Sequence, residues 1–185
     1  MLNNKKIIMK KTTILVVALL VGGTMFSQKM ITRSGEIKFD ATVIGAIEEV
    51  IGTNKTVSAI FDKTTADLVV LALVKSFKFK IPLMEEHFNE NYMDSDKLPK
   101  ASFKGKVLNY NPKAGNYDVE GELTIHGVSN KVKTKMALAN EGGKQLVSGI
   151  FTIKLADYKL DVPSLAKKTL AETAKISIKL TLENK

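Results

Sequence analysis

The chain of 185 residues contains no cysteine and no tryptophan, and it has only two histidines. Without cysteine there can be no disulfide bond, no thiol nucleophile and no thiolate ligand for a metal ion. A metal site would need further ligands at a fixed spacing, which His87 and His126 do not have around them. We therefore predict no metal site, and a fold that is stabilised by its hydrophobic core alone.

The sequence also lacks an apolar run long enough to span a membrane. The run that begins at Ile14 is roughly 8 to 13 residues long, whereas a transmembrane helix needs about 20. Lysines precede this run and two glycines follow it, which is the order of a secretory signal peptide. We predict a signal peptide over residues 1–27, starting at Met1 or Met9, and a periplasmic or secreted protein. An uncleaved N-terminal anchor is the alternative.

No block of like charge is present, although the net charge of the full chain is +9. Acidic and basic residues are interspersed along the chain, and aromatic residues are not interleaved with basic ones in any loop. This pattern is typical of a solvated surface and gives no sign of a nucleic-acid footprint, so we expect no nucleic-acid partner. It allows a weak, transient contact with an anionic membrane surface.

Most of the chain after position 35 alternates between apolar and polar residues with a period of two. Such alternation predicts strands that bury one face and expose the other. Turn sequences separate these strands, among them residues 111–116, 126–130 and 140–143. Many short strands of this kind predict one all-β domain over residues 28–185, in the form of an antiparallel sandwich or barrel. The strands are predicted at 36–41, 76–81, 103–107, 117–125, 132–138 and 176–182.

Three segments depart from the alternation. Residues 83–92 have helical spacing and predict a short helix or ordered loop. The segment around 164–172 follows Pro163 and predicts a loop with a helical turn before the last strand. Residues 66–74 are apolar on both faces, which predicts a strand that is covered on one side or that meets something apolar on both sides.

The face that points inward in such a barrel mixes aromatic residues with small ones. We expect glycines such as Gly105 and Gly121 to leave volume inside and the phenylalanines to form an apolar wall. A small barrel is either filled by its own side chains or holds one ligand. The pattern alone leaves both interpretations open, but it favours an apolar guest if there is one.

Three stretches resemble the YceI-like family of bacterial proteins. They are "HFNENYMDSDKLPKASFKG" from His87, "GELTIHGVSNKV" from Gly121 and "FTIKLADYKLDVP" from Phe151, and the resemblance extends over about residues 30–183. It implies an eight-stranded, lipocalin-like antiparallel barrel that holds a polyisoprenoid or similar amphiphilic chain, often with a quinone-type tail. A homodimer is compatible with the family, but no residue of this chain argues for one.

From the alternation and this resemblance we expect the lipid tail to lie along eight lumen residues, while three residues at the mouth meet the head group. The lumen residues are Phe39, Phe77, Phe79, Phe103, Val119, Leu123, Phe151 and Leu155, and the mouth residues are His87, Tyr92 and Tyr158. No cofactor is expected apart from the bound isoprenoid lipid, a polyprenol or a quinone-type molecule.

The prediction is a carrier or store for such a lipid and not an enzyme. The alternative is a filled barrel that acts as a periplasmic interaction or stress-response protein without a lipid. An enzyme acting on an isoprenoid head group would need a polar cluster at the mouth, where only His87 with Glu85 and Glu86 is available.

Overall fold

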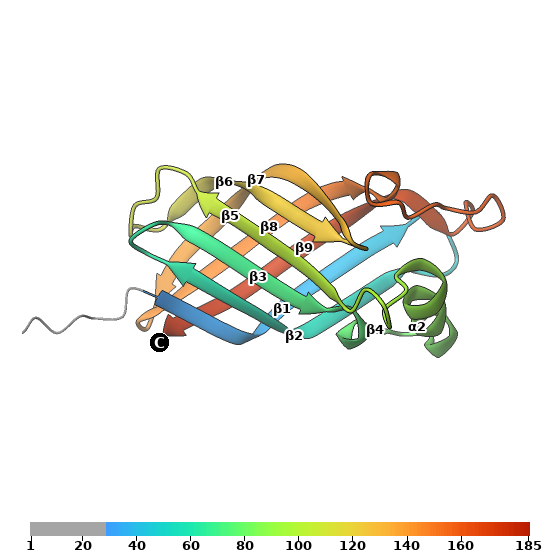
Figure 1. Ribbon diagram of the computed structural model, residues 1–185, viewed down its shortest axis with the longest axis horizontal. Helices are drawn as coiled ribbons and strands as arrows, with labels where there is room; N and C mark the ends of the chain where they lie inside the picture. The colour runs from blue at the N-terminus through green and yellow to red at the C-terminus, as the bar shows by residue number, and fades with distance from the viewer. Residues whose placement is uncertain (1–28) are drawn as a thin grey trace, which may run out of the picture.

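Eight antiparallel strands close into one barrel, as the sequence predicts (Figure 1). The computed structural model describes residues 29–185, so the predicted signal peptide lies outside the described residues. Around the barrel the order is β1-β9-β8-β7-β6-β5-β3-β2, and pairing of β1 with β2 closes the ring. The strands are β1 (Lys29–Thr42), β2 (Ile51–Asp62), β3 (Asp67–Leu73), β5 (Lys100–Val107), β6 (Gly115–Ile125), β7 (Val128–Glu141), β8 (Lys144–Lys154) and β9 (Leu170–Asn184).

One end of the barrel is filled with side chains. The β2–β3, β5–β6 and β7–β8 hairpins and the end of β9 lie at this end, which is on the left in Figure 1. Phe61 and Leu182 are fully buried here, and the Phe61 ring meets the Tyr110 ring edge-on at 4.9 Å. Buried Gln145 donates a hydrogen bond of 3.3 Å to the Tyr110 hydroxyl. We call this the filled end.

The opposite end, which we call the open end, is crossed by the long connection between β3 and β5. This connection contains the 3-10 turn η1 (Val74–Ser76), the two-residue strand β4 (Lys78–Phe79), the helix α2 (Pro82–His87) and the π-helical turn η2 (Phe88–Tyr92). A short helix within 83–92 is therefore confirmed. Pro82 stands at its start, where its fixed φ and missing N–H are tolerated. No helix within residues 29–185 is both long and apolar enough to cross a membrane.

The predicted strand over 76–81 is wrong for most of its length. The chain turns at η1, and only Lys78 and Phe79 pair with β2, opposite Thr53 and Gly52. Phe77 and Phe79 still pack on the core at the open end, as the alternation predicts. They are not held there by a continuous ladder of strand hydrogen bonds.

Two further loops complete the open end. Residues 43–50 join β1 to β2, and residues 159–169 follow the 3-10 turn η3 (Leu155–Tyr158) and lead to β9. The predicted helical turn near 164–172 is shorter than expected. It ends at Thr169, whose N–H donates to the Ala166 carbonyl at 2.9 Å, because Leu170 is already paired with Thr42 in the sheet.

Strand β3 is covered on one side, which is one of the two alternatives predicted for residues 66–74. Leu68, Val70 and Ala72 are buried inside the barrel, but Val69 and Leu73 on the other face are exposed. Exposed Ile60 lies opposite Val69 on β2. The outer wall of the barrel therefore carries apolar side chains in contact with solvent.

Glycines facing the interior do not leave volume, contrary to expectation. Gly105 of β5 lies opposite Gly121 of β6, and a Cβ on Gly105 would lie 2.4 Å from both the Phe103 ring and the Glu120 carbonyl oxygen. The two glycines let β5 and β6 approach closely while the ring of Phe103 covers them. The space is thus used by the neighbouring aromatic side chain.

Candidate functional site

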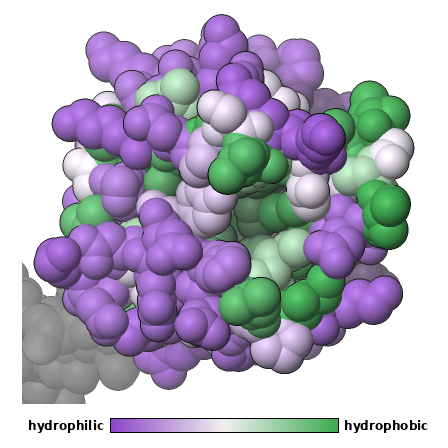
Figure 2. All heavy atoms as spheres, turned by 90° about the vertical axis from the view of Figure 1, so that its right-hand side faces the viewer, coloured by the Kyte–Doolittle hydropathy of each residue, from purple (hydrophilic) through white to green (hydrophobic). Residues whose placement is uncertain are grey.

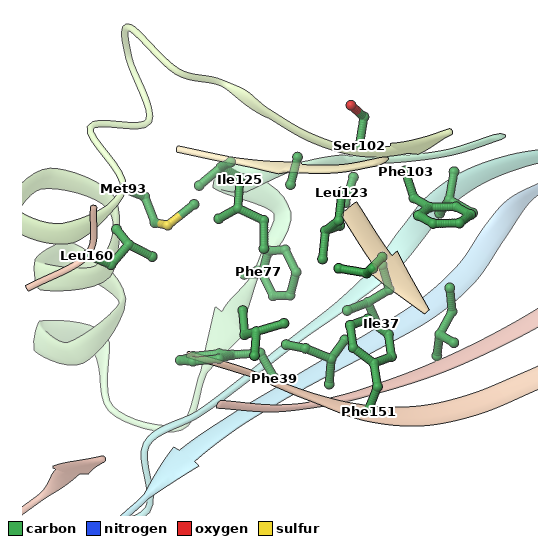
Figure 3. Close-up of a pocket in the computed structure, with 18 of the residues that line it drawn as sticks. Ile37, Phe39, Phe77, Met93, Ser102, Phe103, Leu123, Ile125, Phe151 and Leu160 are labelled. Atoms are coloured by element: carbon green, nitrogen blue, oxygen red, sulfur yellow. The ribbon is translucent and has the colours of Figure 1, made fainter. Parts of the chain in front are cut away.

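An apolar cavity lies inside the barrel between the filled end and the open end. Its volume is about 130 Å³, and side chains from every barrel strand except β2 converge on it (Figure 3). Ser102 and Thr134 are the only residues in the cavity wall with a hydroxyl group, and no titratable residue takes part in it. In Figure 3 the Ser102 hydroxyl points away from the other labelled side chains.

Burial distinguishes this part of the barrel from the filled end. Ile37, Leu123 and Phe151 point inward yet are only half-buried, whereas inward residues of the filled end such as Leu182 have no exposed surface. The difference arises because the half-buried residues border open space instead of other side chains. The interior of this barrel is therefore packed at one end and hollow toward the other.

Four phenylalanines form an aromatic cluster where the cavity reaches the open end. Phe88 of η2 is its centre, with ring centroids 5.7 Å from Phe39, 5.7 Å from Phe77 and 5.0 Å from Phe79. The π-helical turn that carries Phe88 is closed by the hydrogen bond from Met93 N–H to the Phe88 carbonyl. Turns of this kind are frequent at functional positions.

A second hollow, the mouth slot, lies on the outer side of the aromatic cluster. It has a volume of about 200 Å³ and shares Phe39, Phe88, Met93, Leu155 and Leu160 with the cavity wall. These shared residues border both spaces. Viewed onto the open end, Figure 2 shows hydrophobic side chains around a hollow within a largely hydrophilic surface.

The structure places six of the eight predicted lumen residues in the cavity wall: Phe39, Phe77, Phe103, Leu123, Phe151 and Leu155. Phe79 instead belongs to the mouth slot, on the outer side of the aromatic cluster. Val119 faces inward but is completely buried at the filled end. It lies four residues before Leu123 on β6, toward the filled end, and does not line the cavity.

Two of the three predicted mouth residues line the mouth slot. His87 is exposed there and Tyr92 is half-buried, so both can offer polar atoms to a ligand. Tyr158 does not lie in the slot, because its side chain is packed in the core beneath η3 and is 2% exposed. This burial raises the pKa of the Tyr158 phenol.

His126 has the structural role expected for a turn residue. It occupies a left-handed conformation with φ of +50°, and its Nδ1 lies 3.3 Å from the Tyr158 carbonyl oxygen. Within residues 29–185, no group of three or more histidine, aspartate or glutamate side chains is arranged to hold a metal ion.

Several wall residues were not identified from the sequence, above all Phe88, Met93 and Leu160. They come from the helical connection and from the loop after η3, where no period of two indicates which side chains face inward. Phe88 stood within the family motif, but only the tertiary structure brings it to Phe39 of β1.

The helix α2 is attached to β4 by Glu85. Its carboxylate accepts a hydrogen bond from Lys78 Nζ at 2.5 Å and another from the Phe79 N–H at 3.2 Å. The hydrogen bond from Lys78 is the main cause that holds the pKa of Glu85 below its usual value, against the opposing effect of burial. Glu85 thereby fixes the segment that covers the cavity.

Comparison with known proteins gives the same fold. A polyisoprenoid-binding domain from Saccharophagus degradans, implicated in plant cell wall breakdown, superposes with a TM-score of 0.72 at 14% identity, covering 85% of this chain and 99% of that domain. BcnA from Burkholderia cenocepacia gives 0.68 at 18% identity, with 81% and 96% covered. The YceI protein of Campylobacter jejuni gives 0.61 at 21% identity, with 75% and 86% covered.

No curated protein matches the chain at a significant level. The model of the YceI-like domain, however, matches residues 29–182, which is almost the whole of the barrel described above. The chain belongs to the YceI-like domain family.

Proposed function

We propose that this protein binds a long-chain amphiphilic lipid of the isoprenoid type inside the barrel and carries or stores it. The observation that supports this most directly is the cavity wall, which has two hydroxyl groups and no titratable side chain. A polar guest would leave its own groups without partners, at about 1 to 3 kcal/mol each. An apolar chain gains about 25 cal/mol for each Å² that it removes from water.

The ligand enters through the open end in this proposal. Buried side chains such as Phe61 and Leu182 close the other end. The tail would then lie along the cavity wall, and the polar head group would remain in the mouth slot near His87 and Tyr92. A polyprenol and a quinone-type molecule both have this division between tail and head.

The volume of the cavity implies that its wall moves during loading. A cavity of about 150 Å³ holds a molecule the size of benzene, and the cavity here is about 130 Å³. A long chain therefore needs the space on both sides of the aromatic cluster. Displacement of Phe88, which lies between cavity and mouth slot, would join the two.

The similarity to the polyisoprenoid-binding domain of Saccharophagus degradans supports the choice of an isoprenoid lipid. The proposal contains no catalytic step and no cofactor, because no titratable residue lines the cavity. Together with the N-terminal sequence pattern, it describes a lipid-binding protein of the periplasm or the secreted fraction.

Native mass spectrometry of the protein purified without detergent tests the proposal, followed by organic extraction and incubation with added polyprenol or quinone. A bound species with fragments spaced by isoprene units is expected. A protein that carries no lipid and takes up neither compound would instead favour the interaction protein without a ligand.

A further inference from the structure

Three large apolar side chains project into solvent from two loops of the open end. Ile44 and Ile47 are each 102% exposed, and Leu165 is 96% exposed, so they contact almost nothing in the protein. We call these three residues the rim tips. A fully exposed isoleucine or leucine gains none of the free energy that burial of its side chain would give, so three on one end of a barrel require an explanation.

Both loops are held in place at their bases. The Val43 N–H donates to the Thr169 carbonyl at 3.1 Å, which joins the two loops, and the Val50 N–H donates to Thr42 Oγ1 at 2.9 Å. Val50 and Thr169 also line the mouth slot. The rim tips are therefore attached to the opening of the cavity itself.

Local backbone geometry directs the tips outward. The Ala46 N–H donates to the Val43 carbonyl at 3.0 Å across a turn in which Gly45 has a φ of +84°. Such a turn needs glycine after its first central residue, and it leaves Ile44 at the corner. A second turn, from Pro163 to Ala166, is closed by a hydrogen bond of 2.8 Å and carries Leu165 as its second central residue.

The kind of partner follows from the spacing and charge of this surface. The tips are single side chains, Ile44 and Ile47 on one loop and Leu165 on the other, and each is almost fully exposed. They do not form the continuous, complementary patch that a protein interface buries. Glu48 and Glu49 follow Ile47, while Lys167 and Lys168 follow Leu165, so neither sign of charge dominates. Isolated apolar groups beside mixed charges fit a fluid bilayer, which adapts to each side chain separately.

We infer that the open end docks on a lipid bilayer by inserting Ile44, Ile47 and Leu165. The inference rests on the proposed function for its purpose: an isoprenoid lipid resides in a bilayer, and docking would let its tail reach the cavity without crossing water. Attachment depends on the apolar tips, so it extends to zwitterionic membranes and responds weakly to salt.

Flotation of the purified protein with phosphatidylcholine vesicles tests the inference. The variant Ile44→Ser/Ile47→Ser/Leu165→Ser is compared with Ile60→Ser/Ile150→Ser/Leu73→Ser, which removes the same three side-chain types from the outer wall, where they are also exposed. Residues 1–28 are identical in the wild type and in both variants, so a difference in attachment between the proteins comes from the replaced side chains. Rim replacement is expected to weaken attachment by about tenfold for each side chain, while wall replacement leaves it unchanged.

Equal losses in the two variants, no attachment of the wild type, or attachment to anionic vesicles alone with loss at high salt would each overturn the inference. Uptake of polyprenol added from a dilute ethanol stock, without vesicles, is measured in parallel. Uptake without vesicle attachment would refute docking and leave the proposed function intact. Attachment without uptake would refute the proposed function and leave docking intact.

Discussion

Asn54 Nδ2 donates a hydrogen bond of 3.0 Å to the Leu73 carbonyl oxygen at the point where β2 changes its partner from β3 to β4. The Asn54 side chain is fully buried, and its Oδ1 accepts hydrogen bonds from the N–H and the hydroxyl of Thr56. Between the β2–β3 and β2–β4 pairings, where the chain leaves the barrel to cross the open end, the Asn54 side chain thus supplies the hydrogen bond that strand pairing would otherwise make.

Asn54→Leu is therefore expected to destabilise the protein by about 1 to 3 kcal/mol, because it leaves buried backbone groups without partners. Urea unfolding measures this difference. Lys55→Leu is the control, since the neighbouring side chain is exposed. Equal stability of the wild type and Asn54→Leu would show that this hydrogen bond is unimportant.

Filling the cavity should reduce lipid binding. Ala101 of β5 lines the cavity, so the larger side chain of Ala101→Phe would occupy space that roughly two methylene groups of the lipid tail need. The affinity for a polyprenol is therefore expected to fall by about tenfold. Ala137→Phe is the matched control, because Ala137 of β7 is exposed on the outer face. Wild-type affinity in a folded Ala101→Phe variant would place the lipid elsewhere.

Removing the central ring of the aromatic cluster should speed loading. In Phe88→Ala the cavity joins the mouth slot, so uptake of a fluorescent polyprenol analogue in stopped-flow measurements is expected to be several-fold faster. The control is Phe103→Ala, which enlarges the cavity deeper in the barrel without opening its mouth. Equal acceleration by both variants would mean that cavity size, and not access past Phe88, determines the rate.

The glycine pair between β5 and β6 should tolerate no side chain. A Cβ at position 105 would lie 2.4 Å from backbone oxygen, so Gly105→Ala is expected to cost about 1 to 3 kcal/mol in overpacking. Gly115→Ala serves as the control because its Cβ would have no neighbour closer than 3.6 Å. Thermal unfolding of the two variants gives the comparison, and equal midpoints would contradict the proposed close approach.

Acidification should loosen the attachment of α2 to β4. The pKa of Glu85 is lower in the folded protein than its usual value of 4.5, so its contribution is fully present above that value. The contribution, about 0.5 to 1 kcal/mol for a partly exposed pair, is lost as the pH falls through the folded pKa.

The difference in unfolding free energy between the wild type and Glu85→Gln should therefore shrink from about pH 7 to about pH 3. Glu86→Gln, at the exposed neighbouring position, should show little difference at any pH. A pH-independent difference for Glu85→Gln would exclude the ionised carboxylate as the source of its effect.

The sequence by itself determined the antiparallel strands, because the period of two in segments such as 117–125 and 176–182 requires one buried face along each strand. Their closure into a barrel was implied only by the resemblance to the YceI-like family. The sequence also predicted the turn at His126 and the short helix before β5. These features depend on residues close together in the chain.

Only the tertiary structure decided which inward residues border the cavity. Val119 and Leu123 lie on the same face of β6, yet one is packed at the filled end and the other lines the cavity. Alternation specifies a side of the sheet but not a level along the barrel axis. Likewise, Phe88 closes the cavity because it meets Phe39, and Tyr158 is buried because η3 packs on the core. Both contacts join segments that are distant in sequence, and no local pattern encodes such contacts.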